Sequence, residues 1–284
     1  PSQRDGFFGV LSSLCLLVGL LSEAFAQTPV PGDSITGTVQ KLEAVGAKIL
    51  MREGKPYRVD FRGTRAGGKA VLPVVRLKRL GSLDLTGCRI SDDDLAELVP
   101  LSLGQIHLAE TAVTDVGMEH LATMKTLSLV NIEDTQIGDE GLAKIVTLPR
   151  LGDLRLKGSQ VTDQGLNRLS SVTNLWRLSI GGSSISDESL KHLTGLLKLS
   201  GLTVTSSSVS DTGLRTLSAT ANLRQVTLRD SQVTQRAIDQ LKTTHPKLTV
   251  NLQRSPGRPS ARTPPRTASA RSPLSNDSGG PPRT

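Results

Sequence analysis

Asp84 and His107 are the residues whose types and spacing come closest to a reactive pair. A carboxylate beside an imidazole can form an ion pair, contribute to a metal site or serve as a general base. The two residues occupy equivalent positions in consecutive repeats, described below, and adjacent strands lie roughly 4.8 Å apart, so the side chains could touch. We favour an exposed ion pair, because a stable metal site needs about three or four ligands and no nucleophile accompanies the imidazole.

Sequence signatures of the common enzyme classes are absent. The chain has no P-loop, no dinucleotide fingerprint, no H-E-x-x-H, no C-x-x-C and no G-x-S-x-G. Cys88 has no evident base, and its place in the repeat explains it without catalysis. His120, His192 and His245 fall on the helical side and should be surface residues. We therefore expect a non-enzymatic protein without metal or cofactor, and keep an enzyme or an enzyme-recruiting adaptor as a less favoured alternative.

The elements that must position these residues come from a repeat. The pattern L-x-x-L-x-L-x-x-T-x-I-x-D-x-G-L begins at Leu127 and returns, with small changes, at Leu151 and Leu175; its first leucine continues at Leu199 and Leu223, with 24 residues in each step. A fixed period of this length predicts a solenoid, in which each unit buries its apolar face against its neighbours.

Within one repeat the L-x-L portion predicts a short strand and the G-L-x-x-L portion a short helix. Leu154 and Leu156 should point into the core, and a Ser or Thr followed by Asp, as in Thr162-Asp163, should cap the helix start. Gly occupies the same place near the helix start in most repeats, and we call these glycines the Gly column. Ser189 replaces Gly in one repeat, which indicates that the position requires tight packing rather than a left-handed backbone.

A column of small polar residues follows each strand. We expect their side chains to lie inside the turn and to bond its backbone, because buried polar groups need partners. The column comprises Cys88, Thr111, Thr135, Ser159, Ser183, Ser207 and Ser231.

On these residues the chain resembles leucine-rich repeat proteins of the α/β horseshoe type, similar to ribonuclease inhibitor. The I-[ST]-D-x-G-L variant resembles the repeats of bacterial extracytoplasmic leucine-rich repeat proteins and of the cysteine-containing subclass. The resemblance covers roughly Tyr57 to Leu252. It implies an α/β fold, a right-handed horseshoe with parallel strands on the concave face and short helices on the convex face. It also implies a scaffold that binds varied partners, so its bearing on function is limited.

Three rows of outward-facing strand residues should pave the concave face. Row A is Arg58, Ser82, Gln105, Leu129, Asp153, Arg177, Gly201 and Gln225. Row B is Asp60, Asp84, His107, Asn131, Arg155, Ser179, Thr203 and Thr227. Row C is Arg62, Thr86, Ala109, Glu133, Lys157, Gly181, Thr205 and Arg229.

Cations gather in the middle of these rows beside the only Trp of the sequence, and Trp and Arg are enriched at interface hot spots. We expect a ligand to contact Asp84, His107, Asn131, Glu133, Arg155, Lys157, Trp176 and Arg177. The alternative is that the concave face is polar only because it is solvated. A protein partner is expected and an anionic glycan or envelope polymer is possible, whereas nucleic acid is not expected.

The segments outside the repeats predict export. Residues 1–26 have the layout of a secretory signal peptide, with an apolar stretch from Phe7 to Leu21 and Ala24-Phe25-Ala26 before Gln27. The stretch is shorter than the ~20 residues of a membrane span. We expect a periplasmic, cell-surface or secreted protein, with an N-terminal cap at residues 27–56 and about eight repeats of 24 residues at 57–253. Within the cap, Ile35, Val39 and Leu42 should share one face of a helix.

Residues 254–284 are rich in Pro, Ser and Arg and too poor in apolar residues to fold alone, so they should form a disordered basic tail. The tail holds six Arg against one Asp and carries most of the net charge of +8. The sequence thus predicts an exported scaffold that binds a macromolecule through its concave face. The alternative is an envelope structural or adhesion protein whose tail touches a polyanion.

Overall fold

A computed structural model of the chain describes residues 34–182, 184–205 and 207–253. The signal peptide expected at residues 1–26 and the tail expected at 254–284 lie outside the described residues, as do the first seven residues of the expected cap. Among the described residues, no helix is both long and apolar enough to cross a bilayer.

The described strands form one sheet in chain order, from β1 to β10. Only β1 and β2 pair antiparallel, as a hairpin, and each later strand pairs parallel to the one before it. The strands are β1 (Lys48–Arg52), β2 (Lys55–Asp60), β3 (Ser82–Asp84), β4 (Gln105–His107), β5 (Leu129–Asn131), β6 (Asp153–Arg155), β7 (Arg177–Gly181), β8 (Gly201–Thr205), β9 (Gln225–Arg229) and β10 (Thr249–Gln253).

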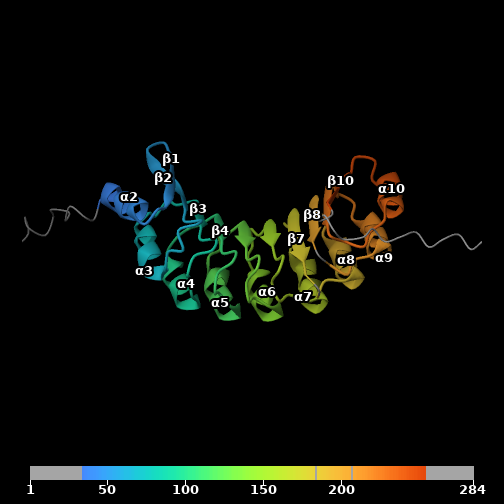
Figure 1. The fold of residues 1–284 in the computed structure, drawn as a ribbon, viewed down its shortest axis with the longest axis horizontal. Helices are drawn as coiled ribbons and strands as arrows, with labels where there is room; N and C mark the ends of the chain where they lie inside the picture. Colours follow the sequence, from blue (N-terminus) through green and yellow to red (C-terminus); the bar gives the residue numbers. More distant parts are fainter. Residues whose placement is uncertain (1–33, 183, 206, 254–284) are drawn as a thin grey trace, which may run out of the picture.

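Each strand from β2 to β9 is followed by helical turns that lie on the other face of the solenoid. Figure 1 shows the strands along the inner side of a curved array and α4 to α9 along its outer side. The α-helices are α2 (Ile35–Ala44), α3 (Gly68–Val71), α4 (Asp92–Leu98), α5 (Asp115–Thr123), α6 (Asp139–Ile145), α7 (Asp163–Asn167), α8 (Asp187–His192), α9 (Asp211–Thr216) and α10 (Gln235–Thr244). Four 3₁₀ turns are Leu72–Arg76, Arg168–Ser171, Leu193–Gly195 and Leu217–Ala219. The predicted solenoid, with strands on one face and short helices on the other, is confirmed.

The core between the two layers is aliphatic. The central residues of successive strands stack in register and are fully buried, and Leu156, on the second inward position, is also buried. The stacked residues are Val59, Leu83, Ile106, Val130, Leu154, Leu178, Leu202 and Val226. Because none of the described helices exceeds 10 residues, their stability comes from this packing rather than from their own hydrogen bonds.

Ser or Thr caps most of the described helices as predicted, whereas α3 and α6 begin after Gly67 and Gly138 without a side-chain cap. The hydroxyl of Thr162 accepts a hydrogen bond from the backbone N–H of Gln164, and Ser210 does the same for Thr212. Ser91 forms a capping box with Asp94 at the start of α4. These contacts satisfy amides that have no partner inside the helix.

The Asp that follows each cap has a second role, which the sequence analysis missed. Its carboxylate reaches the next repeat and accepts hydrogen bonds from the capping residue there. The pairs are Asp92 with Thr114, Asp115 with Gly138, Asp139 with Thr162, Asp163 with Ser186, Asp187 with Ser210, and Asp211 with Thr234. We call this series the aspartate ladder. It ties consecutive helix starts to one another across the outer layer.

The electrostatics of Asp163 reflect these bonds. Burial alone would raise the pKa of its carboxyl group, but the hydroxyls of Ser186 and Ser189 and the backbone amide of Ser186 hold it below its ordinary value. The same ladder explains the Gly column. A Cβ on Gly165 would come within 2.0 Å of an oxygen of Asp139, and one on Gly213 within 2.3 Å of Asp187. Neither glycine has a positive φ, so the predicted tight packing is confirmed.

Most described members of the inner polar column behave as predicted. Ser231 is the exception, because its hydroxyl is buried without a hydrogen-bond partner, and Ser183 lies outside the described residues. The hydroxyls of Thr111, Thr135 and Ser159 donate to the carbonyl three residues earlier, at 2.6–2.7 Å. Cys88 is buried at the equivalent place and lies 3.6 Å from the carbonyl oxygen of Phe61. Burial raises the pKa of its thiol, which favours the unreactive protonated form.

The N-terminal segment has one feature that differs from expectation. Helix α2 forms as predicted, but its buried face consists of Thr38 and Leu42, and Ile35 is exposed. The helix contacts the 3₁₀ turn Leu72–Arg76, and Ile35, at its first position, is 55% exposed. His245 differs too: expected on the surface, it is buried and lies 3.0 Å from the carbonyl oxygen of Thr220.

Candidate functional site

The three predicted rows exist on the concave sheet. Strand pairing places Asp84 opposite His107, Asn131 opposite Arg155, and Asp153 opposite Arg177, as the 24-residue period requires. Row C continues the register at Gly181, Thr205 and Arg229. The side chains of all three rows therefore stand on a rigid sheet with fixed lateral spacing.

Asp84 is held by arginines rather than by His107. Its carboxylate lies 3.2 Å from Nη2 of Arg58 and 3.2 Å from Nε of Arg62, and only 3% of its side chain is exposed. The exposed Asp84–His107 ion pair expected from the sequence is therefore wrong in partner and in exposure. The spacing identified the neighbouring strands correctly but did not show that two arginines reach the same carboxylate.

His107 is half-buried beside this cluster. Burial lowers the pKa of its imidazole; the charge of Asp84 opposes this, and the positive charges of Arg155, Arg58 and Arg62 add to it. The neutral ring is consequently favoured. A neutral imidazole attracts the Asp84 carboxylate only weakly. This agrees with the observation that arginines, not His107, pair with that carboxylate.

Asn131 and Glu133 are engaged in the sheet. The side-chain oxygen of Asn131 accepts from the backbone N–H of Glu133 at 3.0 Å, and Asp84 makes the same bond to Thr86 at 3.1 Å. Row B acids and amides thus shape the turn after the strand. Glu133 itself reaches across β6 to accept a hydrogen bond from Ser179 at 3.0 Å. A ligand would meet these groups with part of their bonding capacity already used.

The central cations are only partly neutralised. Arg155 and Arg177 share the buried carboxylate of Asp153, at 3.2 and 3.8 Å, and Lys157 lies 3.5 Å from Asp134. The longer Arg177 contact is an ion pair without a well-formed hydrogen bond, so its donors stay available.

Trp176 stands at the start of β7, next to these cations. The Arg177 guanidinium lies 4.8 Å from the centre of its ring, within the range of a cation–π contact. The indole packs against Gly152, which directly precedes β6 and where a Cβ would come within 2.8 Å of the ring. Trp176 is nevertheless 44% exposed, so part of its ring stays accessible beside these cations.

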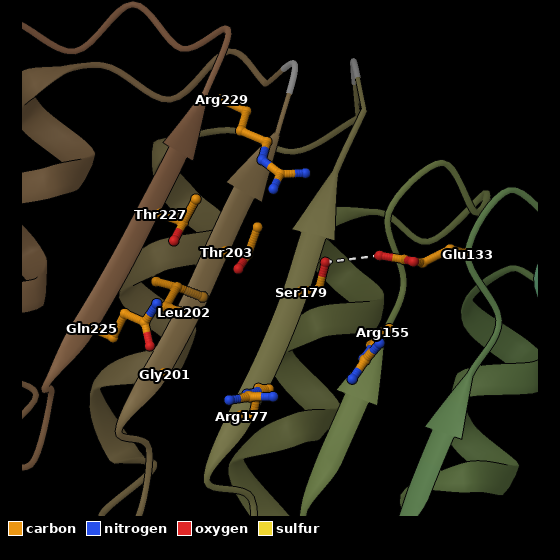
Figure 2. A pocket seen from close by; sticks show the side chains of 10 residues that line it. All are labelled: Glu133, Arg155, Arg177, Ser179, Gly201, Leu202, Thr203, Gln225, Thr227 and Arg229. Atoms are coloured by element: carbon orange, nitrogen blue, oxygen red, sulfur yellow. Dashed lines mark hydrogen bonds between the residues drawn. The ribbon is translucent and has the colours of Figure 1, made fainter. Parts of the chain in front are cut away.

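A pocket of about 410 Å³ opens on the concave face over β6 to β9 (Figure 2). Its lining residues are Glu133, Arg155, Arg177, Ser179, Gly201, Leu202, Thr203, Gln225, Thr227 and Arg229. Three of the residues predicted as binding residues line it, and the pocket extends further toward the C-terminus than predicted. The signal that could have found it is the pairing of small side chains at Gly201 and Thr203 with Arg229 in row C.

Comparison with known proteins agrees with this geometry. Residues 80–99 and 123–146 match the family model described as leucine-rich repeat. The chain has the fold of a leucine-rich repeat solenoid. No curated protein sequence matches it.

Solved structures similar to this leucine-rich repeat solenoid include two internalins from Listeria monocytogenes. Internalin inlF is 25% identical, with a TM-score of 0.50 over 64% of this chain and 50% of that chain. Internalin C2 is 22% identical, with a TM-score of 0.53 over 76% of this chain and 92% of that chain. This chain thus spans half the length of the inlF structure.

A third similar structure comes from a plant. The leucine-rich repeat ectodomain of the Arabidopsis receptor kinase HAESA, solved in complex with a peptide hormone ligand, is 15% identical. Its TM-score is 0.51 over 78% of this chain and 42% of that chain. These likenesses support the fold, which is typical of protein-binding scaffolds.

Proposed function

We propose that this protein is an exported, non-enzymatic scaffold that binds another protein through its concave sheet. The observation that carries the proposal is the group formed by Arg155, Trp176 and Arg177, which project from adjacent strands beside an open pocket. Trp and Arg supply most of the affinity at many interfaces, since Trp presents a large rigid ring and Arg a planar group with several hydrogen-bond donors.

The rigidity of the sheet favours this role. Parallel strands hold the side chains of successive repeats at fixed spacing, so little order must be gained when a partner binds. A solenoid of the same fold, the HAESA ectodomain, was solved with a peptide ligand. This likeness supports a peptide or protein as the partner.

An affinity capture with three baits tests the proposal. The baits are the mature wild-type protein, an Arg155→Ala/Arg177→Ala variant of the concave face and a Lys191→Ala variant. Lys191 lies on α8 and pairs with Glu188 on the outer layer. A partner retained by the wild type and the Lys191→Ala bait, but lost from the concave variant, would support the proposal. Equal retention on all three baits would place the interface elsewhere.

Export is part of the proposal and has its own test. Protein recovered from the native host should begin at Gln27, which N-terminal sequencing would detect. Recovery of intact residues 1–26 in a cytosolic pool would contradict it.

The alternative is an envelope structural or adhesion protein whose basic residues 254–284 touch a polyanion. Fractionation separates the two functions. A soluble periplasmic or secreted pool favours the binding scaffold, and insoluble wall-associated material favours the structural protein.

A further inference from the structure

We propose that the pocket over β6 to β9 binds the carboxylates of an acidic peptide segment, with Arg229 as its principal anchor. This inference rests on the proposed function, because it names the chemistry of the partner that the concave face would bind. It also moves the centre of the site from Trp176 toward β8 and β9, two strands farther along the solenoid.

The hollow exists because one side chain is missing from row A. Gly201 lies between Arg177 and Gln225 in register. A Cβ at Gly201 would meet its nearest neighbours at 3.8–3.9 Å, which is ordinary contact, so packing does not require glycine at this position. Gly181 is different, because its Cβ would come within 2.4 Å of the carbonyl oxygen of Thr205. The absent side chain of Gly201 therefore opens the pocket rather than relieving a clash.

The charges in the pocket are unequally satisfied. Arg155 and Arg177 share Asp153, and Glu133 is bonded to Ser179. Arg229 is exposed, and it takes part in none of the ion pairs formed among residues 34–182, 184–205 and 207–253. Three guanidinium groups thus face two carboxylates, and the guanidinium without an acidic partner projects over the pocket in Figure 2. A planar guanidinium binds a carboxylate through two parallel hydrogen bonds.

The spacing of the cations suits an extended peptide. Arg177 and Arg229 are two strands apart laterally and four residues apart along the strand direction. Their Cα atoms are therefore separated by roughly 16 Å, a distance that an extended peptide covers in about five residues. Between them, the hydroxyls of Thr203 and Thr227 and the amide of Gln225 can bond a peptide backbone.

The lining argues against a glycan or a single-stranded nucleic acid. Both ligands commonly stack their rings on exposed aromatic side chains, and bases do so for much of their binding energy. None of the ten lining residues is aromatic. Trp176, outside the pocket, already has its ring under the Arg177 guanidinium and against Gly152.

A titration with defined probes tests the inference on the full chain. The probes are a Glu-Gly repeat peptide with blocked ends, its Gln-Gly counterpart and a galacturonan oligomer, which carries carboxylates on sugar rings. Trp176 is the only Trp of the sequence, so its fluorescence reports binding near Arg177. Calorimetry gives the affinity independently.

The Glu-Gly peptide should bind in a salt-sensitive manner and the Gln-Gly peptide should not. Arg229→Ala should weaken the affinity about tenfold or more, the loss expected for a charge-assisted hydrogen bond. Arg229→Lys should lie between, because lysine keeps the charge but loses the paired donors. Arg215→Ala, an exposed arginine on α9 of the outer layer, is the matched control and should bind like the wild type.

Gly201→Val should fill the pocket and reduce binding without unfolding the protein, which circular dichroism would verify. If that variant does not fold, Arg229→Ala decides alone. Equal affinity for both peptides, tighter binding of galacturonan, or an unchanged affinity in Arg229→Ala would overturn the inference. If the acidic peptide does not bind while the Arg155→Ala/Arg177→Ala bait still fails to retain the captured partner, only this inference is wrong. If that bait retains the partner as well as the wild type does, the proposed function is wrong too.

Discussion

Asp139 accepts hydrogen bonds from both the backbone amide and the hydroxyl of Thr162 in the next repeat, at 2.8 and 2.7 Å. Thr162 in turn caps its own helix through Gln164. The same hydroxyl therefore serves as a donor between repeats and an acceptor within one. The aspartate ladder thus couples the start of each helix to its neighbour, so the outer layer is joined by directional bonds as well as by apolar packing.

Removal of one carboxylate should weaken that coupling. Asp139→Ala leaves two donors of Thr162 without their partner, so we expect the free energy of unfolding to fall by about 1–3 kcal/mol. Glu140→Ala is the control, since Glu140 is exposed and lies 3.8 Å from Arg168 in a surface pair that should contribute about 0–1 kcal/mol. Urea denaturation of both variants measures the difference, and equal losses would show that the ladder adds no stability.

Two glycines provide a matched test of packing around the ladder. Gly165→Ala would place a Cβ 2.0 Å from Asp139, whereas a Cβ on Gly195 meets nothing within 4 Å. We expect Gly165→Ala to destabilise the protein by about 1–3 kcal/mol or more, as overpacking does, and Gly195→Ala to be neutral or slightly stabilising. Thermal melts of the two variants should therefore separate. Coincident melts would mean that the Asp139 side chain moves away at little cost.

The repeat made most of the fold predictable, because apolar spacing alone determines which face of a strand or helix is buried. Leu154 and Leu156 were placed correctly on that basis. The aspartate ladder was not predicted, because Asp139 and Thr162 meet only after the repeats stack. In the sequence, the position of Asp139 at a helix start already explained an acidic residue there, so no second role was inferred. Ile35 was misplaced because helical periodicity identifies a face but not where the neighbouring core ends.

The candidate site was predictable to the level of rows. The period of 24 residues implies the lateral register, so the neighbours of His107 and Arg155 were known from the sequence. The sequence did not show which of these neighbours form ion pairs, because pairing depends on how far each side chain reaches and how deeply it is buried. Asp84 and Asp153 both proved to be buried acceptors shared by two arginines. The pocket was also not predicted: the small residues Gly201 and Thr203 beside Arg229 indicate open space, but the shape of that space depends on how far the neighbouring side chains reach.

Core truncation should give a large and initially local loss. Leu156 is buried between neighbouring repeats, and Leu156→Ala should cost about 2–5 kcal/mol. Repeats contact mainly their neighbours, so hydrogen exchange should rise first in β5 to β7 and the helices beside them. A variant that melts like the wild type would show that Leu156 does not belong to the cooperative core.

His107 should make stability depend on pH. Its pKa in the folded protein is lowered from 6.5, so the unfolded chain binds the proton more readily than the folded one. The stabilisation is therefore complete above the unfolded value and declines as the pH falls through 6.5 toward the folded value. Urea denaturation should show that, as the pH falls through this range, the free energy of unfolding decreases more for the wild type than for His107→Gln. A parallel pH dependence in both proteins would mean that the imidazole titrates alike when folded and unfolded.

The most direct test of the account is the affinity of the purified partner for variants of the concave face. Arg155→Ala, Arg177→Ala and Trp176→Ala are compared with Lys191→Ala on the outer layer. If the partner binds the concave face, at least one of the first three substitutions should weaken binding by about 1–2 kcal/mol or more, while Lys191→Ala should bind like the wild type. Equal affinities for all four variants would contradict the account and leave Trp176 and its arginines as packing of the sheet.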